Sequence, residues 1–406
     1  MEHKWKKLIG YYKPYQKLFW TDMFFALTGA AVTLIIPLIV RYITNEVVYL
    51  EGNEPLHQII KLGILMMGLV AVEFFCNFYI AYYGHLMGAK MEHDMRNEIF
   101  SHYQKLSFTF YDNQKVGQLL SRVTSDLFDI SELLHHGPED IVISLIKFIG
   151  SFIILFQING TLTLVAYAFI PVMAAYAYYF NKKMKRAFKE NRAKIADINS
   201  QIEDSLSGIR VVKSFANEAE EMRKFCEGNE RFVRTKRTSY WYMGWFHSGL
   251  GALTTMVTIG VLIAGAMMLT RGKLVVTDLI TFLLYINNFT EPVKKLINFT
   301  EQFQNGYSGY ERFLEILDIQ PDIKDAPDAL PLDRVEGDVE FEDVSFGYGE
   351  KKEYVLNHIN LKVKAGEYIA IVGASGGGKT TLCSLIPRFY EVEKGRILLD
   401  GTDIRK

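Results

Sequence analysis

A glycine-rich segment near the C-terminal end carries the residues best suited to chemistry. Residues 373–380 read Gly-Ala-Ser-Gly-Gly-Gly-Lys-Thr and fit the pattern G-x-x-x-x-G-K-[ST]. Such glycines let backbone N–H groups point at phosphate oxygens, the lysine contacts the outer phosphates, and the threonine hydroxyl can bind Mg²⁺. The pattern therefore predicts a phosphate site with a magnesium ion. Its candidate residues are Gly373, Ala374, Ser375, Gly376, Gly377, Gly378, Lys379, Thr380 and Thr381, with Thr380 as the metal ligand.

The segments on either side of this loop fit the same interpretation. Residues 367–372, Glu-Tyr-Ile-Ala-Ile-Val, form a short apolar run rich in β-forming types, which predicts a strand. Lys379–Arg388 can continue as a helix. A loop between a strand and a helix is the context that the phosphate-binding pattern requires.

Composition places this site at the end of a membrane protein. The 406 residues include 45 Lys+Arg against 46 Asp+Glu, so no basic field indicates nucleic acid and no acidic excess indicates disorder. Apolar residues make up 49% of the chain and concentrate before about residue 300. The three cysteines are far apart, without disulfide or zinc-ligand spacing. We expect a helical membrane domain followed by a soluble domain.

Six segments approach the length of about 20 mostly apolar residues that a helix needs to cross a bilayer. They are Leu18–Val40, Leu62–Tyr83, Ile141–Ile158, Leu162–Phe180, Trp245–Leu269 and Leu274–Phe299. The third and fourth form a hairpin that reverses at residues 159–161, and the last is the weakest because charges and a proline interrupt it. Hydropathy alone thus predicts five or six spans.

The distribution of Lys and Arg predicts the orientation. These residues collect in 181–242 and before residue 18, whereas residues 42–60 contain none. Because positive loops stay inside, the N-terminus and the segment 181–242 are expected to be cytoplasmic. Six spans return the C-terminal domain to that compartment and five do not, which favours six.

Two cytoplasmic segments read as long helical arms that continue the spans. One apolar stripe is Met87, Met91, Met95 and Ile99, and a second runs from Met184 to Ile209. The pattern breaks at both tips. There we expect short transverse helices at Gln114–Leu120, capped by Asp112-Asn113, and at Ile209–Phe215.

Four ionisable residues lie in or near the predicted spans, namely Asp22, Glu73, Lys147 and Glu291. Each costs a few kcal/mol in hydrocarbon unless it faces a cavity or a partner. Glu73 is the most central: it would favour cationic amphiphiles if it faces a cavity, or it forms an interhelical hydrogen bond as a protonated carboxyl. Asp22 and Glu291 are interpreted as interfacial.

The complete pattern resembles an ATP-binding cassette (ABC) exporter, with the membrane half first and the ATPase half second. The family's opening strand, which ends in an aromatic residue that stacks on adenine, resembles Val339–Tyr348, and this implies that role for Tyr348. Residues 110–126 resemble the first coupling segment, residues 207–218 the second, and residues 312–318 the connection into the linker.

The resemblance implies a fold, a set of domains and a function. The expected fold is a multi-pass α-helical membrane domain with six spans and cytoplasmic arms, followed by a partial α/β P-loop NTPase domain. The implied division is a cytoplasmic segment 1–16, a transmembrane domain 17–310, a linker 311–336 and part of a nucleotide-binding domain 337–406. The implied function is ATP-driven export of a hydrophobic or amphipathic substrate across a bacterial plasma membrane, with ATP and Mg²⁺, by a homodimer or heterodimer of half-transporters.

The sequence also departs from the family. Only 27 residues follow Lys379, so the glutamine loop, signature sequence, Walker B strand with its catalytic Glu, and switch His are absent from the chain as given. Hydrolysis needs a group that positions water and stabilises the transferring phosphoryl, so we expect no hydrolysis by this chain alone. A non-hydrolysing membrane subunit or regulatory fragment is the alternative.

Two other classes are disfavoured. A soluble P-loop kinase or GTPase conflicts with the uncharged run Trp245–Leu269. A secondary transporter conflicts with the phosphate loop and the long arms.

Overall fold

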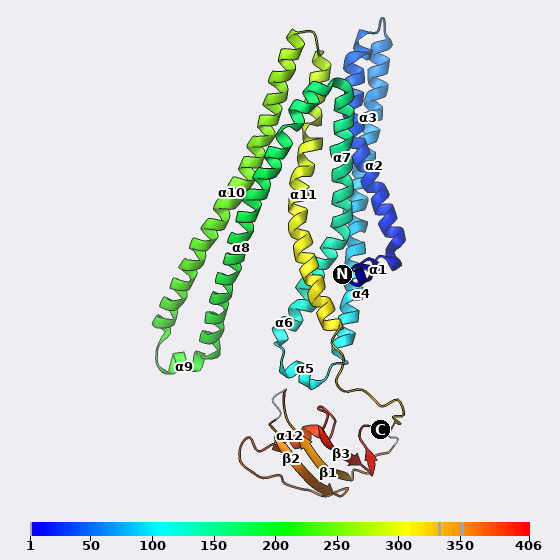
Figure 1. Cartoon of the computed structure of the whole chain (residues 1–406). Coiled ribbons are helices and arrows are strands. Elements are labelled where there is room, and N and C mark those ends of the chain that lie inside the picture. Colours follow the sequence, from blue (N-terminus) through cyan, green and yellow to red (C-terminus); the bar gives the residue numbers. More distant parts are fainter. Residues whose placement is uncertain (1, 332–333, 350–352) are drawn as a thin grey trace. The chain divides into compact units, whose positions relative to one another are not determined.

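The chain folds into two compact units, each of which is made from two parts of the sequence. A computed structural model describes residues 2–331, 334–349 and 353–406. The first unit contains residues 1–89 and 132–304, and the second contains residues 90–131 and 305–406. Long helices form most of the first unit, and the second contains the sheet (Figure 1). Linker residues 332 and 333 lie outside the described residues.

The helices are long because each apolar segment continues into a polar segment without a break in the helix. Their bounds are α1 Glu2–Gly10, α2 Gln16–Asn45, α3 Glu54–Tyr79, α4 His85–Tyr103, α5 Phe108–Asp112, α6 Val116–Ser121, α7 Leu127–Tyr167, α8 Phe169–Ser207, α9 Ile209–Ser214, α10 Glu218–Thr270 and α11 Val276–Leu317. Short 3-10 turns η1 and η2 cover Lys13–Tyr15 and Val47–Tyr49, and π-helical turns η3 and η4 cover Ile80–Gly84 and Arg122–Asp126. At 1.5 Å per residue, the 53 residues of α10 extend about 80 Å.

Four helical stretches of the described residues are long and apolar enough to cross a membrane. They are Lys4–Tyr49, Glu54–Tyr103, Val116–Ser207 and Glu218–Thr270. The third stretch contains two of the predicted spans, and α11, which contains the weak sixth, is outside this set. The helical membrane fold is confirmed, and the count of six spans stays a prediction.

The reversal between the third and fourth predicted spans is confirmed. Asn159 leaves the helical conformation, with φ −156° and ψ 104°. Its side-chain oxygen accepts a hydrogen bond from the Leu162 backbone N–H at 3.0 Å, so Asn159 caps the next helical segment. A second interruption, at Ala168, precedes Pro171, which has no N–H to donate to the Tyr167 carbonyl.

The apolar stripe of the first arm is confirmed, and that of the second is only partly so. Met87, Met91, Met95 and Ile99 are all buried. In the second arm α8 packs beside α10 (Figure 1), and Ile198 is buried, but Ile202 and Leu206 are exposed. Toward α9 the helix pair leaves an apolar groove of about 270 Å³ instead of a closed core.

Both transverse tip helices are present, but the predicted cap of the first is wrong. The helix α6 begins after Lys115, and no side chain caps it. Asp112 ends α5 instead, and Asn113 donates its side-chain amide to the Thr109 carbonyl at 3.0 Å. These two polar residues therefore close the preceding helical turn.

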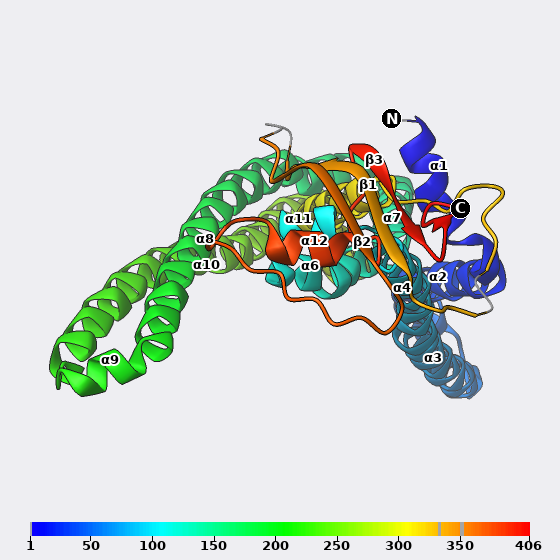
Figure 2. The same ribbon diagram turned by 90° about the horizontal axis from the view of Figure 1, so that it is seen from below.

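The second unit contains an antiparallel sheet in the order β2-β1-β3-β4. Its strands are β1 Val339–Phe346, β2 Leu356–Val363, β3 Lys394–Leu399 and β4 Thr402–Asp403. The helix α12, Lys379–Leu385, places Leu382 and Leu385 in a core with Phe341, Val344, Leu356 and Ile397. Figure 2 shows α12 and the strands from below.

The strand predicted for residues 367–372 is not formed in the described structure. No strand pairs with it, and Tyr368, Ile369 and Val372 are exposed. A strand needs a partner for its backbone groups, and β1 already pairs with β2 and β3 on its two sides. The following helix is also shorter than predicted and ends at Leu385, because Pro387 cannot donate to the Cys383 carbonyl.

Candidate functional site

The phosphate loop adopts a conformation that depends on its glycines. Gly376 and Gly378 have φ values of 83° and 81°, in the left-handed region that other residues rarely occupy. A Cβ at Gly378 would lie 2.8 Å from Leu356 Cδ2 and 3.1 Å from the Val355 carbonyl oxygen. A glycine is therefore required at position 378 for two separate reasons, and at position 376 for its backbone angle alone.

Lys379 closes the loop. Its ammonium donates hydrogen bonds to the carbonyl oxygens of Gly373 at 3.1 Å and Ala374 at 2.7 Å. The loop residues 373–377 are exposed, so the charged group lies at an accessible turn. An ammonium beside an open glycine-rich turn suits anionic phosphate oxygens, and the residues present fit a nucleotide phosphate.

The two threonines of the motif differ in their surroundings. Thr380 is exposed at the first turn of α12, where its hydroxyl is accessible to a magnesium ion. Thr381 is buried, and its hydroxyl accepts a hydrogen bond from the Tyr348 hydroxyl at 3.1 Å. The structure thus brings Tyr348 to the helix that follows the loop, across 33 residues of sequence.

Tyr348 lies just beyond the end of β1, as the strand prediction requires. The ring makes edge contacts with Phe346 and Tyr390, with centroid separations of 4.9 and 5.2 Å. It remains 46% exposed. The neighbouring rings and the hydroxyl contact hold Tyr348 in place while leaving aromatic surface accessible. Its assignment as the residue that stacks on a base stays a prediction.

Sequence reasoning missed the residues that connect this site to α5. Phe108 packs against Phe389 with a centroid separation of 4.4 Å. The Tyr390 hydroxyl donates a hydrogen bond to Asp112 Oδ2 at 2.8 Å. Burial, followed by this hydrogen bond, raises the pKa of Tyr390 to about 12. The only sequence signal was the aromatic pair Phe389-Tyr390 after the helix.

A second connection joins two of the motifs found in the sequence. Arg312 donates from Nε and Nη2 to the two carboxylate oxygens of Asp126, at 2.8 and 2.6 Å. This bidentate hydrogen bond, more than the neighbouring acidic groups, raises the pKa of the Arg312 guanidinium. Arg122 adds a hydrogen bond to the Arg312 carbonyl at 3.1 Å. The end of the first coupling segment is therefore fixed to the segment that leads into the linker.

The ionisable residues of the predicted spans fall into three environments. Lys147 and Glu291 face each other, with Nζ 3.6 Å from Oε2. Asp22 is buried and its carboxylate lies against Gly84, while its interpretation as an interfacial residue stays a prediction. Glu73 is half-buried, and among the described residues its carboxylate makes no hydrogen bond, so both of its interpretations stay open.

Comparison with known proteins agrees with this architecture. The ABC transporter transmembrane region family matches residues 19–293, and the ABC transporter family matches residues 356–406. The ABC transporter ATP-binding protein YwjA of Bacillus subtilis is 40% identical over 98% of this chain and 69% of its own length. The ATP-dependent lipid A-core flippase of Syntrophus aciditrophicus is 30% identical over 98% of this chain and 66% of its own length. The chain is therefore a multi-pass membrane protein that belongs to the ABC transporter family.

Proposed function

We propose that the protein is one half of a dimeric exporter that uses ATP to move a hydrophobic or amphipathic substrate across the bacterial plasma membrane. In this proposal the N-terminus and the nucleotide-binding part, from residue 337, are cytoplasmic. The membrane and ATP-binding matches to the family support the membrane and ATP-dependent parts of the proposal. The flippase relative, whose name gives it a lipid A-core substrate, supports an amphipathic cargo.

The observation that carries the proposal is the series of contacts from Tyr348 through Tyr390 to Asp112. Tyr348 also donates to Thr381 in the helix after the phosphate loop. Asp112 ends α5, which lies between the arm helices α4 and α7 in the sequence. A nucleotide that repositions Tyr348 or Thr381 would therefore act on the segment that joins two membrane helices. Such a path is what an ATP-driven change of the membrane domain requires.

The residues of the site have distinct roles in this proposal. Lys379 holds the outer phosphates, the backbone N–H groups of the loop donate hydrogen bonds to the phosphate oxygens, and Thr380 binds Mg²⁺. Tyr348 orients the base by stacking. ATP supplies the free energy when it binds and is hydrolysed. Arg312 keeps the coupling segment fixed through Asp126.

Partner choice and hydrolysis belong to the same proposal. Half-transporters of this family act in pairs, so we propose that the protein forms a homodimer or a heterodimer with another half-transporter. The expectation that the 406-residue chain does not hydrolyse ATP by itself stays a prediction, which a phosphate-release assay on the purified chain tests.

The decisive experiment combines ATP binding and export. The purified chain in detergent is titrated with a fluorescent ATP analogue and Mg²⁺, and cells expressing the protein are loaded with a lipophilic fluorescent dye. Lys379→Ala should abolish analogue binding and slow dye efflux, whereas Lys364→Ala, which changes the lysine that directly follows β2 and pairs with Asp338, should leave both unchanged. Equal binding by wild type and Lys379→Ala would show that the phosphate loop is not the ATP site. Normal binding with efflux equal to that of empty cells would reject export by this chain alone.

A further inference from the structure

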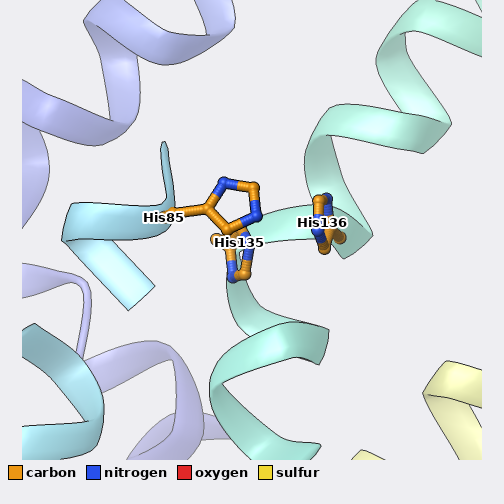
Figure 3. Close-up of side chains that lie close together, drawn as sticks. All are labelled: His85, His135 and His136. Atoms are coloured by element: carbon orange, nitrogen blue, oxygen red, sulfur yellow. The ribbon is translucent and has the colours of Figure 1, made fainter. Parts of the chain in front are cut away.

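Three histidines from two helices converge in the first unit, outside the nucleotide site. His85 begins α4, and His135 and His136 are adjacent on α7 (Figure 3). One ring nitrogen from each lies within 4.8 Å of the others. Their ring centroids are separated by 4.1 to 5.0 Å. The cluster therefore joins residues that are about fifty positions apart in the sequence.

The backbone of α4 is shaped to admit this cluster. His85 directly follows the π-helical turn η3, and such turns locally shift the direction of side chains. A Cβ at Gly88 would lie 2.7 Å from His135 Nδ1, so the glycine allows the imidazole to lie directly against the helix. His135 is only 2% exposed. The packing thus holds one ring rigidly and places the other two beside it.

Carboxylates face the imidazoles. Glu132 Oε1 lies 3.9 Å from His135 Nε2, and its Oε2 lies 3.7 Å from His136 Nε2. Glu139 Oε2 lies 3.9 Å from His136 Nδ1, and this glutamate is buried. Acidic side chains next to histidines neutralise a bound cation and orient the imidazole rings.

The donor set selects a class of ion. Imidazole and carboxylate groups without thiolates suit Zn²⁺, Ni²⁺, Co²⁺ or Cu²⁺, whereas Mg²⁺ and Ca²⁺ prefer oxygen ligands only. Ligands of a tetrahedral zinc ion, bound at about 2.0–2.1 Å, lie about 3.4 Å apart. The observed spacing of up to 4.8 Å is wider than this value, so binding requires the exposed His85 and the half-buried His136 to rotate toward His135.

We propose that His85, His135 and His136, with the Glu132 carboxylate beside two of them, bind a divalent transition-metal ion of the Zn²⁺ class. Because the ligands come from α4 and α7, the bound ion joins these two helices. This site is separate from ATP binding and goes beyond the proposed export function. It would stabilise the arrangement of the two helices seen here.

The test measures metal binding by the whole chain in detergent, purified with an affinity tag that contains no histidine. The protein is stripped with a chelator, exchanged into buffer and titrated with Co²⁺, whose visible absorption reports tetrahedral coordination, and then with competing Zn²⁺. Zinc content after desalting is measured by mass spectrometry. We expect one ion per chain, with displacement of Co²⁺ by Zn²⁺.

Two variants and one matched control decide the outcome. His85→Ala and His136→Ala should each raise the Kd for Zn²⁺ by more than about 100-fold, the upper range for losing an outer-shell partner. His57→Ala changes an exposed histidine of α3 and should bind like wild type. No bound metal in wild type, or equal binding by His85→Ala and His57→Ala, would overturn the proposal. Because His85 is exposed, its variant decides the question even if His136→Ala does not fold.

Discussion

Replacing single glycines of the phosphate loop by alanine separates backbone strain from steric exclusion at the nucleotide site. Gly373, Gly376 and Gly378 belong to the same loop but have different constraints. A Cβ at Gly373 meets nothing within 4 Å, and its φ is not positive. A Cβ at Gly376 also meets nothing within 4 Å, but φ is +83°. At Gly378 a φ of +81° is combined with atoms at 2.8 and 3.1 Å.

The expected magnitudes follow from these differences. Alanine in the left-handed region costs about 1–2 kcal/mol, so Gly376→Ala should weaken nucleotide binding about 5- to 30-fold if the loop keeps its shape. Overpacking adds about 1–3 kcal/mol at Gly378, where the neighbouring backbone oxygen of Val355 cannot rotate away as a side chain could. Gly378→Ala should therefore lose more than about 30-fold, and Gly373→Ala should lose little.

The assay is displacement of a fluorescent ATP analogue from the purified chain, with each variant's melting temperature measured in the absence of nucleotide. The expected order of affinity is wild type and Gly373→Ala, then Gly376→Ala, then Gly378→Ala. Equal affinity for Gly373→Ala and Gly376→Ala would refute the strain argument. A Gly378→Ala variant that binds as well as Gly376→Ala would refute the steric argument and show that the loop rearranges when the nucleotide binds.

Three further predictions concern the connections and the spans. Tyr390→Phe removes the hydrogen bond to Asp112 and should speed proteolysis at α5 at neutral pH. Folding raises the pKa of Tyr390 from 10.0 to about 12, so the hydrogen bond stabilises the wild type fully below pH 10. This extra stability of the wild type over Tyr390→Phe should disappear as the pH rises to 12. Arg312→Ala leaves the buried Asp126 carboxylate without its bidentate partner and should cost about 1–3 kcal/mol, between the values for exposed and buried pairs. Thermal unfolding checks this, and the double variant with Asp126→Asn should recover part of the loss; a melting temperature unchanged by Arg312→Ala would contradict it. In an intact homologue that carries this glutamate, Glu73→Gln should slow efflux of cationic amphiphiles but not of neutral ones if Glu73 faces a cavity. Equal effects on both dyes would favour the interhelical hydrogen bond.

Local patterns in the sequence predicted the elements whose stability is local. The apolar stripe from Met87 to Ile99 is buried as predicted, and the break at Asn159 follows from the capping ability of its own side chain. The predicted loop, with Gly376 and Gly378 at positive φ, follows from residue types alone. In each case the physical cause lies within a few positions along the chain.

Predictions failed where partners far away in the sequence decide the outcome. Residues 367–372 have β-forming side chains but no strand to pair with in the described structure, and backbone pairing cannot be judged from propensity. The burial of Asp22 against Gly84 likewise depends on a residue of another helix, which the local sequence does not indicate. The contacts of Phe108 with Phe389 and of Tyr390 with Asp112 join residues more than 270 positions apart, which no local pattern can indicate.

The family, the apolar helices and the phosphate loop could be predicted from the amino-acid sequence, because each depends on residue types at fixed short spacings. The folded structure was needed to show which side chains meet: Tyr348 with Thr381, Arg312 with Asp126, and His85 with the adjacent pair His135-His136. The histidine pair was visible in the sequence, but its third member was not. The helix packing that admits the cluster depends on Gly88, whose missing side chain matters only once α7 lies against α4.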